Sequence, residues 1–84
     1  MNEEELKQNI ITTLLEIAPD IEASNLDPAV SFRDQFEIDS VDFLNFVLTL
    51  EKKLDVKLSE IDYPKLSSLR GCISYLTLEL VKKP

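Results

Sequence analysis

The chain has 84 residues, of which 44% are hydrophobic and 30% charged, so it suits one small folded domain, residues 1–84, rather than a disordered chain. Its formal net charge is −7 and unevenly placed: residues 1–42 hold eleven acids and two bases (net −9), whereas residues 43–84 hold five acids and seven bases (net +2). An acidic surface repels phosphate backbones, so we expect no nucleic-acid partner and instead expect proteins with basic patches.

The first periodic segment predicts a helix from about Glu3 to Ile17. Asn2 suits the N-cap, and the acids that follow it suit the positive end of the helix dipole. Pro19 ends the pattern. The core-facing stripe consists of apolar residues at helical spacing: Leu6, Ile10, Ile11, Leu14, Leu15 and Ile17.

Residues 20–38 lack clear periodicity and predict a long loop. Loops of this length in small domains tend to be functional or disordered, and apolar anchors favour a functional one. Asp27 and Pro28 predict a short helical turn, because proline suits a first helical position. The apolar anchors, which we expect to pin the loop onto the core, are Ile21, Leu26, Val30, Phe32 and Phe36.

The next segment predicts a helix from Ser40 to about Leu54, with Asp39 as N-cap and Asp42 as the acid of a capping box. It is more apolar than packing on one side requires. Two interpretations stay open: a central core helix with several neighbours, or a helix that also lines a pocket or docks on a partner. The expected apolar face is Val41, Leu44, Val47, Leu48 and Leu54, and Phe43, Phe46 and Leu50 extend it around the helix.

Ser59 predicts the start of a short helix, which Pro64 limits to about one turn. Ser67 or Ser68 then caps a last helix, in which Gly71 indicates the close approach of another helix. The inward stripe of this last helix is Leu69, Ile73, Leu76 and Leu80, and Lys82 and Lys83 suit the negative end of its dipole.

These segments predict an all-α fold. We expect a small four-helix bundle, with three long helices plus one short helix and a long loop between the first and second helices. A monomer is the simplest expectation.

The chain has no histidine and one cysteine, Cys72. It therefore lacks the parts for Ser-His-Asp or Cys-His chemistry and for a histidine-ligated metal, so we expect neither catalysis nor a metal site. Cys72 is expected to be a small, partly buried side chain. The sequence shows no signal-peptide pattern and no apolar run of roughly 18 residues, so we expect a cytoplasmic protein without membrane insertion.

Ser40 admits two interpretations. It can be a plain capping residue next to Asp39, since both residue types are favoured at helix starts. It can also be a modification site, because a phosphate on a hydroxyl at a helix N-terminus faces free backbone N–H groups and the positive end of the dipole.

The run around Ser40 resembles the attachment motif of acyl carrier proteins. Asp34-Gln35-Phe36-Glu37-Ile38 precedes Asp39-Ser40-Val41-Asp42, the following apolar helix contains Leu50-Glu51, and the helical layout from Leu6 to Leu80 is similar to that of the family. The family's later core positions correspond to Leu58, Leu66, Leu69 and Ile73.

The resemblance implies that Ser40 carries 4'-phosphopantetheine, transferred from coenzyme A by a phosphopantetheinyl transferase that uses Mg²⁺. The arm's thiol would hold acyl groups as thioesters, which acyl-loading and acyl-transfer enzymes with basic docking patches use in fatty-acid, polyketide or related biosynthesis. Asp39 would assist the transferase. Partner recognition would fall to Asp42, Glu37 and Glu51, and the acyl-chain cleft to Val41, Phe46, Val47 and Leu66.

Three departures from the family pattern suggest a specialised carrier. Glu37 replaces the usual glycine, Val41 replaces the common leucine, and Asn45, Lys52 and Lys53 stand where fatty-acid carriers often have acids. Two alternatives stay open: an aminoacyl or peptidyl carrier, which shares the fold and the serine, and a cofactor-free helical protein-interaction module.

Overall fold

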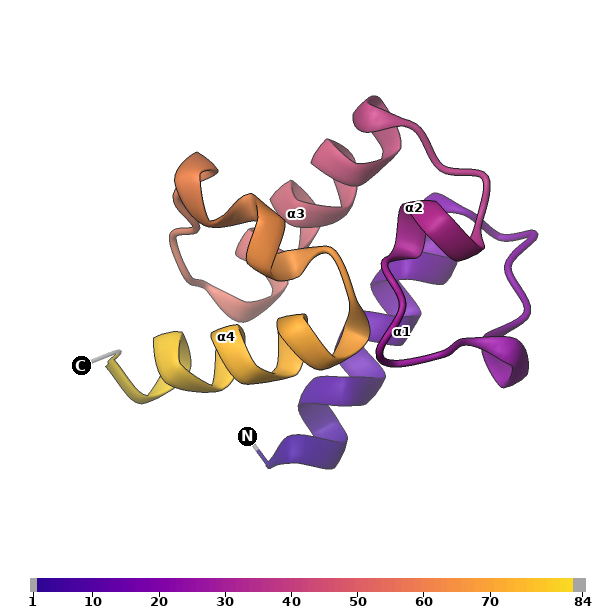
Figure 1. Ribbon diagram of the computed structural model, residues 1–84. Coiled ribbons are helices and arrows are strands. Elements are labelled where there is room, and N and C mark those ends of the chain that lie inside the picture. The colour runs from indigo at the N-terminus through magenta and orange to yellow at the C-terminus, as the bar shows by residue number, and fades with distance from the viewer. Residues whose placement is uncertain (1, 83–84) are drawn as a thin grey trace.

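Figure 1 shows the computed structural model, which describes residues 2–82. Its three long helices are α1 (Glu3–Ile17), α3 (Ser40–Leu54) and α4 (Leu69–Lys82). Shorter elements lie between them: η1 (Ala23–Asn25), α2 (Phe32–Gln35) and η2 (Glu60–Leu66). α1 packs against both α3 and α4, and η2 packs against α4. The predicted all-α bundle, with three long helices and a shorter one, is confirmed.

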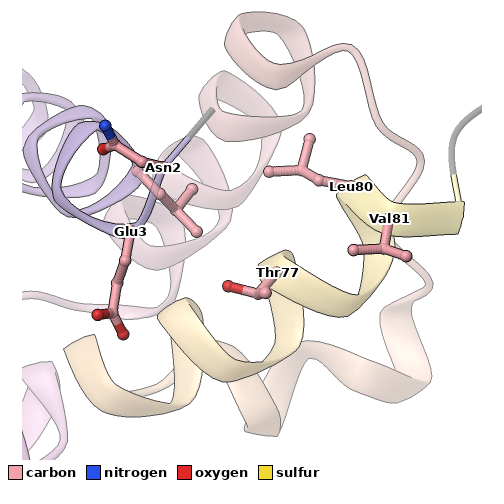
Figure 2. Close-up of a pocket in the computed structure, with 6 residues that line it drawn as sticks. Asn2, Glu3, Thr77, Leu80 and Val81 are labelled. Atoms are coloured by element: carbon pink, nitrogen blue, oxygen red, sulfur yellow. The ribbon is translucent and has the colours of Figure 1, made fainter.

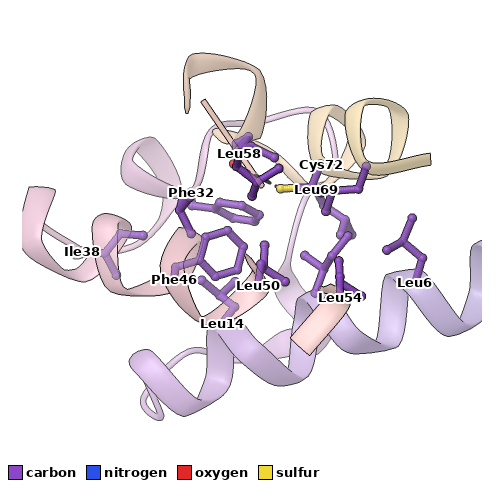
Figure 3. Close-up of a cluster of buried hydrophobic side chains, with 14 residues drawn as sticks. Leu6, Leu14, Phe32, Ile38, Phe46, Leu50, Leu54, Leu58, Leu69 and Cys72 are labelled. Atoms are coloured by element: carbon purple, nitrogen blue, oxygen red, sulfur yellow. Dashed lines mark hydrogen bonds between the residues drawn. The ribbon is translucent and has the colours of Figure 1, made fainter. Parts of the chain in front are cut away.

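One core joins all the long helices, as Figure 3 shows. The rings of Phe32 and Phe46 meet edge to face in it, with centroids 5.4 Å apart. Thr13 is also buried, and its hydroxyl donates to the carbonyl of Asn9 at 2.7 Å, so this polar group is satisfied. The buried apolar residues are Leu6, Ile10, Leu14, Phe32, Ile38, Phe46, Val47, Leu50, Leu54, Leu58, Leu66, Leu69, Cys72 and Leu76.

The predicted bounds of α1 and α3 are confirmed, because local chemistry fixes both ends. The side chain of Asn2 accepts from the N–H of Glu5 at 2.8 Å and starts α1. Asp55 adopts a left-handed conformation, with φ 52°, and ends α3. Among residues 2–82 there is no helix with the length and apolar character that a membrane span requires.

The loop after α1 contains the predicted capped turn at Asp27 and Pro28. The Asp27 carboxylate accepts from the N–H of Ala29 at 2.9 Å, and the Val30 N–H donates to the Asp27 carbonyl at 3.3 Å. This turn does not continue into a helix, and the short helices of the loop are η1 and α2. The predicted anchoring is confirmed: Phe32 is buried, and its N–H donates to the carbonyl of Ser67 at 2.7 Å.

The short helix after α3 is longer than predicted. It is a 3₁₀ helix over Glu60–Leu66 with Pro64 inside it, so the expectation of about one turn was wrong. The fixed φ of proline fits the 3₁₀ range, which explains why Pro64 does not end this helix.

Ser68, one of the two serines predicted to cap the last helix, caps α4. Its hydroxyl accepts from the N–H of Gly71 at 3.1 Å. The predicted close approach at Gly71 is confirmed: a Cβ there would collide with the backbone carbonyl of Lys65 in η2. The predicted roles of Lys82 and Lys83 fall on side chains outside the described part of the chain.

Candidate functional site

Ser40 is the first residue of α3 and is exposed to solvent. The predicted capping box holds this turn: the Asp39 carboxylate accepts from the N–H of Asp42 at 2.9 Å, and the Asp42 carboxylate accepts from the N–H of Asp39 at 3.3 Å. The N–H groups of Ser40 and Val41 belong to the first turn, where a helix offers them no carbonyl. An anionic group on the Ser40 oxygen would therefore lie beside backbone donors and the positive end of the dipole.

The segment that leads into Ser40 is anchored to the core. Ile38 is only 8% exposed, and its N–H donates to the carbonyl of Phe36 at 3.0 Å. Phe36 packs against the core from the loop. The chain thus enters α3 from an anchored residue. The Ser40 hydroxyl lies at the surface, while Ile38, two residues earlier, is buried.

Gln35 is a positioning residue that sequence reasoning missed. Its amide oxygen accepts from the N–H of Asp27 at 2.9 Å, and its amide nitrogen donates to the carbonyls of Asp27 and Val30, both at 2.9 Å. Three bonds from one side chain join residues five and eight positions apart and hold the loop that precedes Ser40. No local pattern signals this role, since the partners are brought together only by the turn at Asp27.

Of the three predicted partner-recognition residues, the structure brings two together near Ser40. Glu37 is exposed and Asp42 half-buried, and both line an open hollow of about 670 Å³. Asp20 and Glu22 line the same hollow, so acids from two separate segments meet beside the start of α3.

Glu51 lies elsewhere, near the other end of α3. It is half-buried, and its carboxylate accepts from the N–H of Leu58 at 3.1 Å. This bond links α3 to the segment that leads into η2, so Glu51 has a structural contact that its sequence position did not reveal.

The predicted apolar face of α3 was wrong in part. Val41 is 64% exposed, and Leu44 and Leu48 are each 43% exposed. These three residues, spaced i, i+3 and i+7, form one stripe along the helix, which we call the outer face of α3. The residues of α3 that do enter the core are Phe46, Val47, Leu50 and Leu54. The apolar excess noted in the sequence therefore lies on the solvent side, next to Ser40.

The four predicted cleft residues do not share one environment. Phe46, Val47 and Leu66 are at most 1% exposed and belong to the core, whereas Val41 is exposed. An acyl chain could reach the three buried residues only if core side chains moved.

A second open hollow, of about 460 Å³, lies at the other end of α1 (Figure 2). Asn2 and Glu3 border it from the N-terminal end of α1, and Thr77, Leu80 and Val81 border it from α4. It is therefore separate from the attachment segment.

Cys72 is fully buried, and its thiol donates to the carbonyl of Leu66 at 3.2 Å. Burial raises the pKa of this thiol far above its ordinary value, which makes it unreactive. Within residues 2–82, no group of three or more His, Cys, Asp or Glu side chains could hold a metal ion.

Comparison with known proteins agrees with this geometry. The family model described as a phosphopantetheine attachment site matches residues 8–76 of the chain. An acyl carrier protein from Chlamydia felis (strain Fe/C-56) is 34% identical over 56 residues, which cover 67% of this chain and 72% of the relative. The chain belongs to the acyl carrier protein family, whose members are carriers rather than enzymes and bear a covalently attached 4'-phosphopantetheine.

Proposed function

We propose that Ser40 is the residue that bears 4'-phosphopantetheine and that the chain carries acyl intermediates as a monomeric module. One observation carries this proposal: the Ser40 hydroxyl is exposed at the first position of a capped helix, on a segment anchored by Ile38. A phosphodiester formed there gains the backbone donors and dipole of the first turn. The single core that joins the three long helices supports a monomeric module.

In the attachment reaction, the Ser40 oxygen bonds to the phosphorus that bears the pantetheine of coenzyme A, the bond from that phosphorus to the bridging pyrophosphate oxygen breaks, and adenosine 3',5'-bisphosphate leaves. The hydroxyl proton passes to a base, which we propose the transferase supplies. Asp39 holds the helix start through its cap, and its charge would favour the transferase's Mg²⁺. Once attached, the arm supplies a thiol that holds the acyl group as a thioester.

Intact-protein mass spectrometry tests the site. Wild type, Ser40→Ala and Ser59→Ala are incubated with coenzyme A, Mg²⁺ and a broad-specificity phosphopantetheinyl transferase. Ser59 is the matched control, because it is also an exposed serine that caps a helix. We expect one phosphopantetheinyl increment on wild type and Ser59→Ala and none on Ser40→Ala. No increment on folded wild type, or one that persists in Ser40→Ala, would overturn the assignment.

We further propose that partner enzymes dock on the outer face of α3, with basic groups placed near Ser40. Glu37 and Asp42 supply negative charge at that end. The other end differs: Lys52 is exposed, and Lys53 forms an ion pair with Glu16 at 2.8 Å. The positive charge of Lys52 at this end favours a partner that is less basic there than near Ser40, which suits a specialised pathway rather than general fatty-acid synthesis.

Loading by a general malonyl transferase with a basic docking surface tests this charge pattern. We expect slow loading of the wild-type carrier and several-fold faster loading of Lys52→Glu, because the substitution removes a repulsive contact. Lys57→Glu is the control, since it makes the same charge change outside α3. Efficient loading of wild type, or equal gains in the two variants, would contradict the specialised carrier.

A further inference from the structure

A row of aromatic rings runs from the surface between η2 and α3 into the core. The rings of Tyr63 and Phe43 meet edge to face with centroids 6.4 Å apart, and Phe43 lies 6.2 Å from Phe46. Phe46 in turn meets Phe32 at 5.4 Å. Phe46 and Phe32 are buried, whereas Phe43 and Tyr63 are half-buried, so these two form the outer layer of the row.

The helix that carries Tyr63 is held firmly against α4. The Tyr75 hydroxyl donates to the Asp62 carboxylate at 2.6 Å, and this hydrogen bond raises the pKa of Tyr75 and keeps its proton in place. Lys65 pairs with Asp62 at 3.3 Å and lies 5.6 Å from the centre of the Tyr75 ring. Gly71 lets the Lys65 backbone approach α4 closely. Several contacts therefore oppose a movement of η2 away from α4.

The Phe43 and Tyr63 rings affect where an acyl chain attached through Ser40 can lie. Phe43 lies three residues after Ser40, on the next turn of α3. A chain attached through Ser40 that entered between α3 and η2 would have to displace the Phe43 and Tyr63 rings before it reached Phe46. Close-packed interiors leave no room for such a chain without displacement of side chains.

We propose that Phe43 and Tyr63 form a closed aromatic gate between α3 and η2, which keeps an acyl chain on Ser40 outside the bundle. This inference rests on the proposed function of Ser40. The carrier then presents its cargo directly to partner enzymes. The predicted cleft around Phe46, Val47 and Leu66 forms only when the gate is opened.

The test uses the octanoyl form, made with octanoyl-coenzyme A and a broad-specificity phosphopantetheinyl transferase. The proteins are wild type, Tyr63→Ala, Phe43→Ala and the control Ile61→Ala, which truncates an 88% exposed residue of the same η2 helix. Intact mass first establishes one octanoyl-phosphopantetheinyl increment. Two measurements follow: the rate at which hydroxylamine cleaves the thioester, relative to octanoyl-coenzyme A, and the melting temperature of each octanoyl form relative to its own unacylated form.

We expect wild type and Ile61→Ala to be cleaved as fast as octanoyl-coenzyme A and to melt at the same temperature with or without the octanoyl group. In Tyr63→Ala, buried octanoyl should slow cleavage several-fold and raise the melting temperature, with Phe43→Ala giving the same change. Protection of octanoyl in wild type would overturn the gate, and this comparison needs no variant to fold. Folded gate variants without protection would overturn it too. Absence of any increment would instead contradict the attachment site, which separates the two failures.

Discussion

The two faces of α3 carry the same kind of residue, but one face is buried and the other is exposed. Leu50 is fully buried against the core, whereas Leu48, two positions earlier, is 43% exposed. Hydrophobicity alone does not distinguish them, since both are leucines in one helix. The side of α3 that packs into the core against α1 decides which leucine is covered, and the uncovered stripe starts beside Ser40. An apolar residue in such a helix can therefore serve either stability or docking.

The largest expected effect compares these two leucines directly. Leu50→Ala should lower the free energy of unfolding by about 2–5 kcal/mol, because it removes buried methyl groups and leaves a cavity. Leu48→Ala should stay within about 0.5 kcal/mol, as surface substitutions usually do. Urea unfolding followed by circular dichroism measures both. Similar losses for the two variants would show that the outer face is covered in solution.

The next effect concerns the contact between η2 and α4. Gly71→Ala should destabilise the fold by about 1–3 kcal/mol, because the added methyl group collides with the Lys65 carbonyl. This loss exceeds the gain of about 1 kcal/mol that alanine brings to a helix interior. Ser74→Ala, at an exposed position of α4, provides the control and should not destabilise. A stabilised Gly71→Ala would mean that η2 moves away at little cost.

A smaller effect concerns the N-terminal end of α3, where Asp39 caps the helix. Asp39→Ala should cost about 1 kcal/mol of stability through the lost cap, whereas Asp39→Asn should cost only a few tenths, since asparagine caps equally well. Both variants should receive phosphopantetheine more slowly than wild type, because both remove the charge. Chemical unfolding and initial transfer rates measure the two roles. A full transfer rate in Asp39→Asn would limit Asp39 to the cap.

The last comparison is between the thiol of the phosphopantetheine arm and the thiol of Cys72. Its effect on stability is absent at neutral pH. Iodoacetamide at pH 8 should label the arm of the modified protein and leave Cys72 unlabelled, because burial raises the pKa of that thiol. Intact mass should then show one label on the modified protein and none on the unmodified one.

Urea should unfold the modified protein and expose Cys72, so that this thiol takes a second label. Because the folded thiol has the raised pKa, its contribution to stability is complete below about pH 8.5, the ordinary pKa, and falls as the pH rises above it. Rapid labelling of folded, unmodified protein would contradict the buried position.

Much of the secondary structure followed from local sequence. The caps at Asn2 and Asp39 and the helical spacing of apolar residues fixed the bounds of α1 and α3, because these signals act within one or two turns. The length of the helix around Pro64 was predicted incorrectly. Pro64 was taken as the end of that helix, although the fixed φ of proline fits a 3₁₀ helix and the helix continues to Leu66.

For the candidate site, sequence alone singled out Ser40 and its capping acids, because a serine at a helix start is recognisable from its immediate neighbours. Only the tertiary structure decided which apolar residues of α3 are buried, how Gln35 holds the preceding loop, and that Tyr63 meets Phe43. These features join residues distant in sequence. Their energies depend on which surfaces meet in space, and no local pattern contains that information.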